Sequence, residues 1–595
     1  MLLESIDWII IVVFFAVILT IGILAAKRAG RSAEDFFLSG RRMPFWLLGI
    51  SMVATTFSTD TPNLVTDMVR THGVSGNWLW WAFLLTGMLT VFVYTKLWRR
   101  SNVMTDIEFY EIRYSGKTAA FLRGFRAVYL GVFFNIMVMA AVSLAAIKIG
   151  GVLLGLSPLK TISVALLITV IYCVAGGLHS ILMTDFFLFT FAMFGAVMAA
   201  IVACKHPDVG GLANLMSHQN VAGKLNLLPD FSDPTMLVPL FLIPIAVQWW
   251  SVWYPGAEPG GGGYMVQRVL SAKNEKHAMG ATLLFNCCHY ALRPWPWILV
   301  ALASLIVFPD MNALRQAFPQ IDPNIMKNDL AYPAMLTFLP HGLLGIVVAS
   351  LIAAYMSTMA SQINWGSLYI VNDVYKRFIK PDASEKQLVL VGRISTVVLM
   401  LLAGAIALCL QNALQVFHIL LQIGAGTGLI FILRWFWWRI NALTELTGMI
   451  VSFLVAVYIE IIHTKYFGPL PSHLSLIIGV GITTVSWMLV TFLTKPAEDK
   501  TLRNFYRLVR PGGIGWNKVI EKAAKDGDPI TETAKPGDLP LGIFCMFIGC
   551  FAVYGTVFAA GYYMYAKIVP AVICTAVAVV STIILISTWG KLEMK

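Results

Sequence analysis

The sequence has few charged residues. Only 12% of its 595 residues are Asp, Glu, Lys or Arg, whereas soluble proteins have about 25%. The eight cysteines lie in or beside apolar segments, and their spacing is not that of a metal site. Paired catalytic acids, His-rich metal sets and a nucleophile elbow are also missing from the apolar segments. The shortage of charge excludes an ordinary soluble domain, and the missing motifs lead us to expect no enzyme.

Apolar runs fill most of the chain. Hydrophobic residues make up 58% of it, and the mean hydropathy is +0.75. Runs of about 20 apolar residues are typical of helices that cross a bilayer, because a helix satisfies its own backbone hydrogen bonds. We therefore predict an all-α polytopic membrane protein with about fifteen spans, whose surrounding partner is the lipid bilayer.

Lys and Arg residues recur at alternate connections between the predicted spans. Basic residues are enriched in cytoplasmic loops, so we expect a multi-pass protein of the cell (inner) membrane, with the N-terminus outside and the C-terminus in the cytoplasm. These loops also explain the net charge of +12 without nucleic-acid binding. The basic segments are 27–43, 96–126, 268–276, 376–386, 434–439, 495–535 and 591–595.

Two apolar segments are interrupted at matching places. The stretch "ATTFSTDTPN" (54–63) interrupts one, and "VQWWSVWYPGAEPGGGGYMVQR" (247–268) interrupts another roughly five spans later. Paired interruptions are typical of transporters built from inverted repeats. We predict two halves with flanking segments on either side. The expected divisions are 1–43 with an extra span and a cytoplasmic loop, 44–204, 236–438, and 439–595 with extra spans and a cytoplasmic loop at 496–540.

The residues in these interruptions explain why a helix would break there. Pro62 has no amide hydrogen to donate to the carbonyl of Ser58, and its ring crowds that carbonyl. Four consecutive glycines, 260–263, each disfavour a helix by about 1 kcal/mol relative to alanine. Non-helical backbone at membrane depth has to be covered by protein or water, which indicates a cavity or an ion site. The alternative for the first break is a simple proline kink.

A later span, 347–377, has polar side chains on one helical face. Ser350, Ser357, Ser361 and Asn364 recur at helical spacing, and Thr358 adds a second hydroxyl beside Ser357. Hydroxyls and backbone carbonyls together form a nearly neutral oxygen shell, which suits a monovalent cation better than calcium or magnesium. The alternative is that each hydroxyl bonds its own backbone one turn earlier.

Four motifs at these places resemble the sodium:solute symporter family, which includes sodium/galactose, sodium/proline and sodium/sialic-acid cotransporters. They are "SMVATTFSTDT", "GGLHSILMTDFF", "YMVQRVLSAKN" and "AAYMSTMASQIN", and the resemblance covers roughly residues 1–440. It implies a LeuT-type five-plus-five inverted repeat, with one extra N-terminal and about four extra C-terminal helices. It also implies a sodium ion bound by the carbonyls of Ala54, Phe57 and Ala354 and the hydroxyls of Ser357 and Thr358.

Some members of that family bind a second sodium ion. Asp185 and Ser361 match two of its ligands, but Ala360 stands where another hydroxyl is usual. We therefore expect one sodium ion, with Asp185 and Ser361 as the candidate second site.

The resemblance also implies where a solute would bind. The candidate residues are Thr56, Asp60, Thr61, Asn77, Tyr264, His289, Arg293 and Gln422, with Tyr264 resembling an inner gate. A buried arginine in a span needs a partner. For Arg293 this partner is either Asp60 or Glu258, or a carboxylate of the solute.

These patterns favour sodium-coupled import of a small polar organic solute by alternating access, without an obligate protein partner. Two alternatives stay open. One is proton coupling through Asp60 or Asp185, and the other is a solute sensor of the same fold.

Overall fold

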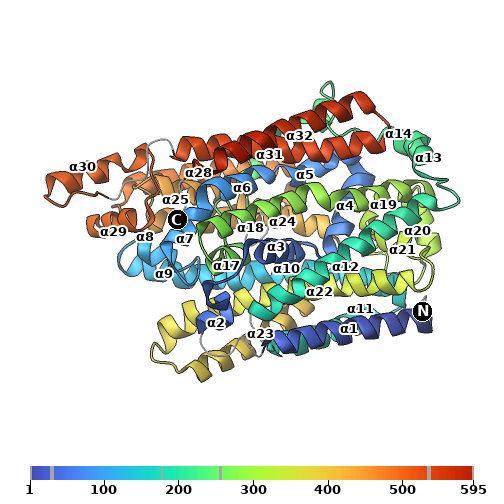
Figure 1. Cartoon of the computed structure of the whole chain (residues 1–595), viewed down its shortest axis with the longest axis horizontal. Helices are drawn as coiled ribbons and strands as arrows, with labels where there is room; N and C mark the ends of the chain where they lie inside the picture. Colours follow the sequence, from blue (N-terminus) through green and yellow to red (C-terminus); the bar gives the residue numbers. More distant parts are fainter. Residues whose placement is uncertain (1–2, 27–32, 176–177, 253–257, 532–537, 593–595) are drawn as a thin grey trace.

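The computed structural model describes residues 3–26, 33–175, 178–252, 258–531 and 538–592. Within these ranges the chain is helical and contains no β-strand. The long helices run roughly along the longest axis of the molecule (Figure 1). The predicted basic loop at 27–43 and Pro255 of the second interruption lie partly or wholly outside the described residues.

Eleven helical segments in the described part are long and apolar enough to cross a membrane. They are Ser5–Gly22, Val74–Ser101, Gly116–Leu154, Leu178–Lys205, Glu275–Val307, Leu343–Ile379, Glu385–Ala407, Ala442–Phe467, Ser472–Leu493, Asp538–Met564 and Ile568–Trp589. The other predicted spans coincide with shorter or broken helices. These are α3 (Phe45–Thr56), α4 (Asp60–His72), α11 (Pro158–Ala175), α15 (Pro234–Leu237), α16 (Ile243–Ala246), α24 (Ala413–Ala425) and α25 (Gly428–Phe436).

The first predicted break lies between α3 and α4, at residues 57–59. Pro62 is in the first turn of α4, where a missing amide hydrogen costs nothing. The hydroxyl of Thr61 donates to the carbonyl oxygen of Thr56 at 3.2 Å, and the amide of Phe57 donates to that of Val53 at 2.8 Å. The prediction of a true break, rather than a kink, is confirmed.

The second predicted break lies before α17 (Gly263–Ser271). A 3-10 turn, Gln248–Trp250, follows α16, and the chain is non-helical again from 258 to 262. Gly260 and Gly261 have φ angles of 88° and 80°, a conformation that favours glycine. The glycine run therefore ends the irregular segment and allows α17 to begin.

Helix α22 (Leu343–Leu368), which carries the predicted hydroxyl face, lies among α1 (Ser5–Ala26), α3, α10 (Asn135–Ile149) and α12 (Leu178–Lys205). The fully buried Asp7 of α1 accepts backbone hydrogen bonds from Gly342 (2.7 Å) and Gly345 (2.8 Å). A carboxylate at a helix N-terminus is favourable because it meets unpaired amides and the positive end of the helix dipole. The extra N-terminal helix thus fixes one end of α22.

The polar segment predicted at 496–540 contains a helical hairpin, α29 (Asp499–Val509) and α30 (Asn517–Lys525). It lies at the end of the molecule far from the N-terminus (Figure 1). Helix α29 packs against α7 (Thr95–Ser101) and α8 (Phe109–Arg113), and Trp516 donates to the carbonyl oxygen of Trp435 at 2.8 Å. The hairpin therefore packs against this end of the helical bundle.

Several arginines that the sequence placed in basic loops are buried. Arg113, Arg126, Arg268 and Arg434 are each at most 3% exposed. Arg126 pairs with Glu258 (3.3 Å) and Arg434 with Glu445 (3.5 Å). Their assignment to loops was wrong, because all four lie in helices whose burial depends on packing that the sequence alone does not show.

One buried ion pair joins α10 to the connection before α22. The ammonium of Lys148 contacts both carboxylate oxygens of Asp329, at 2.7 and 2.6 Å, and neither side chain is more than 1% exposed. Removing one partner from such a pair leaves an uncompensated charge in the interior.

We expect Lys148→Met to lower the free energy of unfolding by about 3–5 kcal/mol, because Asp329 then stays buried and charged. Thermal unfolding of the purified chain measures the loss. The double variant Lys148→Met/Asp329→Leu is the control and should lose less than either single variant. Equal stability of the wild type and both single variants would contradict the role of the pair.

Candidate functional site

The five predicted sodium-binding residues lie together where α3 ends beside α22. Ala54, Phe57 and Ala354 are each 2% exposed, Ser357 is 1% and Thr358 is 0% exposed. The Thr358 hydroxyl donates to the carbonyl oxygen of Thr55 at 2.8 Å. The two helices therefore make a direct polar contact at the predicted place.

The oxygens at this place fit the predicted ion. At the end of α3 the carbonyl of Ala54 accepts from the Phe57 amide at 3.2 Å. A carbonyl oxygen has a second lone pair, and two hydroxyls from α22 face the same region. Carbonyl and hydroxyl oxygens without a thiolate or imidazole suit a hard cation. The assignment of the five ligands remains a prediction that this geometry supports.

The predicted second sodium residues, Asp185 and Ser361, belong to a fully buried polar network. Asp185 accepts hydrogen bonds from Ser357 (2.6 Å) and Ser51 (2.5 Å). The guanidinium of Arg268 donates to Ser361 at 2.7 Å and to Ser51 at 3.3 Å. A fixed positive charge therefore already sits between the two candidate ligands.

Arg268 is a site residue that the sequence did not reveal. It was assigned to a basic loop that begins at residue 268, but α17 continues to Ser271 and buries it. The available signal was its place inside the quoted motif "YMVQRVLSAKN", immediately after the second break.

A small cavity lies next to the first break, and we call it the central cavity. Its volume is about 40 Å³, room for about one water molecule at roughly 30 Å³ each. The cavity brings together five of the eight predicted solute-binding residues. It is lined by Thr56, Ser58, Asp60, Thr61, Leu64, Val65, Trp80, His289 and Arg293.

Thr56, His289 and Arg293 form a closed hydrogen-bonded set in this cavity. Arg293 lies 3.1 Å from the Thr56 hydroxyl and 3.0 Å from Nε2 of His289. Because a guanidinium only donates, Nε2 accepts and Nδ1 carries the proton, which it donates to the Thr56 hydroxyl at 3.1 Å. The ring is thus a neutral imidazole with a fixed tautomer.

Two polar atoms of the central cavity have no hydrogen-bond partner among the described residues. They are Oδ1 of Asp60 and Oγ of Ser58. Buried polar atoms are normally paired. An acceptor and a hydroxyl that converge on the same cavity are suitable contacts for a polar solute.

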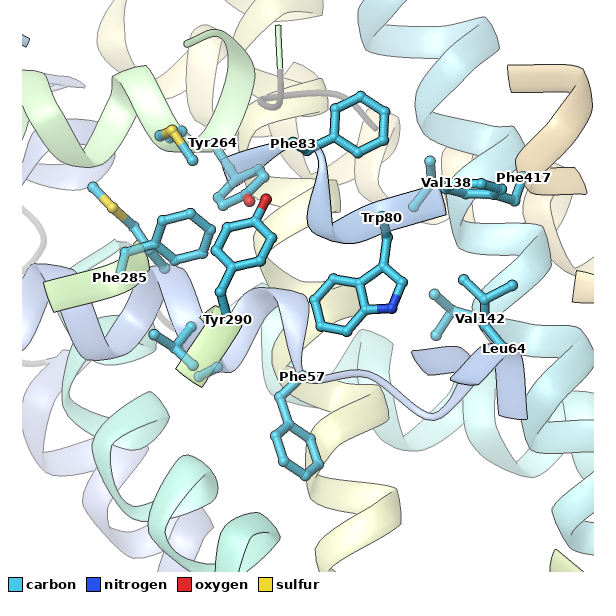
Figure 2. Packing of buried hydrophobic residues seen from close by; sticks show 14 of the residues in the cluster. Phe57, Leu64, Trp80, Phe83, Val138, Val142, Tyr264, Phe285, Tyr290 and Phe417 are labelled. Atoms are coloured by element: carbon cyan, nitrogen blue, oxygen red, sulfur yellow. The ribbon is translucent and has the colours of Figure 1, made fainter. Parts of the chain in front are cut away.

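The other three predicted solute residues do not line the central cavity. Asn77 accepts a hydrogen bond from the indole of Trp80 at 2.8 Å, so it positions a residue of the wall. Tyr264 is 1% exposed and lies near Tyr290 (Figure 2). Gln422 lines a separate cavity.

The two acids proposed as partners of Arg293 have different surroundings. Glu258 forms an ion pair with Arg126, at 3.3 Å, and its pairing with Arg293 remains a prediction. Asp60 lines the same cavity as Arg293. Arg126 belongs to α9 (Gly116–Val128), so this ion pair joins α9 to the segment before α17.

Comparison with known proteins agrees with this geometry. The model of the "Sodium:solute symporter family" matches residues 36–452. The chain is 26% identical to the sodium/glucose cotransporter of Vibrio parahaemolyticus over 479 residues, covering 77% of this chain and 86% of that protein. It is also 26% identical to human sodium/myo-inositol cotransporter 2 over 593 residues, covering 90% and 83%. The solved structure of a Na+-coupled sialic acid symporter is 21% identical, with a TM-score of 0.65, and the match covers 83% of this chain and 99% of that one.

The fold and the site define a polytopic secondary transporter, not an enzyme. The chain belongs to the sodium:solute symporter family and is a sodium-coupled symporter. The predicted fold class, an all-α membrane protein with a LeuT-type inverted repeat, is confirmed. The residue boundaries of its two halves remain predictions.

We expect Arg268→Gln to reduce transport at least tenfold, because it removes the positive charge that organises Ser51 and Ser361 around Asp185. Arg268→Lys should recover part of the activity, since lysine keeps the positive charge but lacks the planar guanidinium that donates to two hydroxyls at once. Solute uptake into proteoliposomes measures both. Arg393→Gln, at an exposed arginine, is the matched control, and wild-type uptake by Arg268→Gln would refute the role.

Proposed function

We propose that the chain imports a small polar organic solute together with one sodium ion by alternating access. The observation that carries this proposal is the contact between Thr358 and the carbonyl of Thr55, 2.8 Å long, at the break between α3 and α4. An ion bound there would touch both helices at once.

Sodium could bind at this place without displacing the hydrogen bonds that the two α22 hydroxyls already make. In the structure the Thr358 hydroxyl uses its proton on the Thr55 carbonyl, and the Ser357 hydroxyl uses its proton on Asp185. The lone pairs of both hydroxyl oxygens can serve as ligands, together with the carbonyls of Ala54, Phe57 and Ala354. The bound ion would hold α3 against α22 and so fix the wall of the central cavity.

The buried Arg268 supports a stoichiometry of one sodium ion. Its guanidinium donates to Ser361 and Ser51, and these hydroxyls also surround Asp185. A second cation at Asp185 and Ser361 would be repelled by this charge at close range, where the interior screens poorly.

The solute has to be polar and has to bind in a more open state. The central cavity of about 40 Å³ is too small for a sugar-sized solute, so binding would require it to widen. When the cavity opens, Asp60 and Ser58 offer the unpartnered atoms, and Arg293 supplies a positive charge beside them. Relatives named for glucose, myo-inositol and sialic acid transport support a solute rich in hydroxyl groups.

The membrane potential would drive import in the orientation expected from the sequence. One positive charge that crosses 100 mV gains about 2.3 kcal/mol, close to a fiftyfold concentration ratio. Coupling requires that sodium and solute each strengthen the binding of the other by the same factor.

We expect Ser357→Ala and Thr358→Ala to raise the sodium concentration for half-maximal uptake at least tenfold, with little change in solute affinity at saturating sodium. Each variant removes one ligand oxygen. Ser350→Ala is the matched control, since the Ser350 hydroxyl bonds its own helix, at Val347. Uptake that stays equally sensitive to sodium in both variants would contradict the assignment of Ser357 and Thr358 as sodium ligands. Sodium-free uptake driven by a pH gradient would indicate proton coupling.

For the wild-type chain we expect a Hill coefficient near 1 for sodium and one sodium ion taken up per solute. The physical reason is the guanidinium between the second pair of candidate ligands. Parallel uptake of labelled sodium and solute into proteoliposomes gives the ratio. A Hill coefficient near 2 together with a ratio of two would show that Arg268 does not exclude a second ion.

A further inference from the structure

Two of the membrane-crossing segments have neighbouring ends next to the hairpin α29–α30. Their helices α26 (Ala442–Val457) and α28 (Ser472–Leu493) pack against each other. Arg439 lies just before α26, and its guanidinium donates to the carbonyl oxygens of Phe492 at 3.0 Å and Thr494 at 3.4 Å. The start of one span and the end of the other therefore meet at the same membrane boundary.

The turn between α29 and α30 reaches this boundary and carries an exposed isoleucine. The amide of Trp438 donates to the carbonyl oxygen of Gly515 at 3.3 Å. A Cβ atom on Gly515 would lie only 2.1 Å from the carbonyl oxygen of Phe436, so the turn packs backbone against backbone. The adjacent Ile514 is 89% exposed, and Leu493, the last residue of α28, is 83% exposed. Large apolar side chains exposed at the end of a span are suited to contact with lipid.

Two cations lie over the same tryptophan at this boundary. The guanidinium of Arg439 is 5.9 Å and the ammonium of Lys518 is 5.4 Å from the centre of the Trp438 ring, within the range of a cation–π contact. Neither cation forms an ion pair within the described part of the chain, whereas Arg503 of the hairpin pairs with Asp526. Arg439 and Lys518 therefore leave a local positive charge, which attracts an anion.

The combination of charge and apolar surface fits an anionic phospholipid. Its phosphate would face Arg439 and Lys518, and its acyl chains would cover Ile514 and Leu493. Tryptophan is enriched at headgroup depth, and lysine and arginine near the ends of spans extend toward the headgroups. In the orientation expected from the sequence this boundary faces the cytoplasm, where anionic lipids attract basic segments.

We propose that Trp438, Arg439, Leu493, Ile514 and Lys518 form a site that binds one anionic phospholipid of the surrounding bilayer, and we call it the interfacial lipid site. None of the predicted sodium or solute residues belongs to it, so it goes beyond the transport function proposed above. The bound lipid would join the turn of the hairpin to the ends of α26 and α28.

The hairpin also contacts α25, which connects the interfacial lipid site to the core. The guanidinium of Arg113 donates to the carbonyl oxygens of Arg434 at 2.8 Å and Trp437 at 3.0 Å. The same guanidinium lies 5.3 Å from the ring centre of Phe505 and 5.0 Å from that of Trp516. Arg113 is thus enclosed between the end of α25 and the aromatic side chains of the hairpin. A lipid that holds the turn in place would keep this packing intact.

The test is lipid binding to the purified full-length chain, measured by native mass spectrometry. The probes are dioleoyl phosphatidylglycerol, which is anionic, and dioleoyl phosphatidylcholine, which has the same acyl chains and no net charge. We expect the first molecule of phosphatidylglycerol to bind at least tenfold more tightly than phosphatidylcholine. Lys518→Gln should weaken the binding of phosphatidylglycerol at least threefold, and Arg439→Gln/Lys518→Gln should weaken it at least tenfold.

Hydrogen exchange in lipid nanodiscs locates the bound lipid. Peptides that cover residues 510–520 should exchange at least fivefold more slowly when the nanodiscs contain phosphatidylglycerol than when they contain phosphatidylcholine alone. Ile514→Ser should remove most of this difference, because the turn then lacks its apolar contact with the acyl chains. Ile514 and Lys518 are both exposed, so folding tolerates these changes.

Two controls make the test specific. Lys525→Gln makes the same change at an exposed lysine at the other end of α30 and should leave both measurements unchanged. Ser357→Ala/Thr358→Ala should also leave them unchanged, which separates this proposal from the sodium site.

Three results would overturn the proposal. The first is equal binding of the two lipids by the wild type. The second is wild-type binding of phosphatidylglycerol by both Lys518→Gln and Arg439→Gln/Lys518→Gln. The third is displacement of the lipid by excess inorganic phosphate, which would indicate a site for free phosphate instead of a phospholipid.

Discussion

The break between α3 and α4 is the constraint on which the rest of the structure depends. A membrane interior offers no water to exposed backbone groups, so the chain itself has to satisfy the interrupted helix. Thr358 of α22 donates to the Thr55 carbonyl, and Thr61 donates to that of Thr56. Helix α22 must therefore lie beside the break, and Asp7 of α1 holds its N-terminal end. One of these groups, the Thr358 hydroxyl, is also among the five predicted sodium ligands.

Buried charges organise the space around both breaks. Arg268 of α17 connects the second break to Ser51 and Ser361, close to the first. On the other side of the second break, Glu258 pairs with Arg126 of α9. The interior charges are thus compensated by residues far apart in sequence. A movement that opens the central cavity has to keep each of these groups paired, and this favours helices that move as rigid units.

The two helix breaks could be predicted from local sequence. The residues that contact them could not, because they come from distant parts of the chain. Pro62 and the glycine run mark both interruptions, and the spacing of Ser357 and Ser361 places them on one helical face. The sequence did not reveal that Arg268 is buried, because the polar residues after it resemble a loop. It also grouped Gln422 with the central residues, whereas Gln422 lines a separate cavity. Side-chain burial depends on which helices lie next to each other, and composition and spacing do not determine that.

The central claim is that one sodium ion joins the end of α3 to α22. Hydrogen exchange followed by mass spectrometry, in sodium and in potassium at equal ionic strength, tests it most directly. The account predicts that sodium slows exchange at least tenfold in peptides that span residues 54–61 and 354–361, and leaves the hairpin α29–α30 unchanged. Equal exchange of both peptides in the two salts would contradict it.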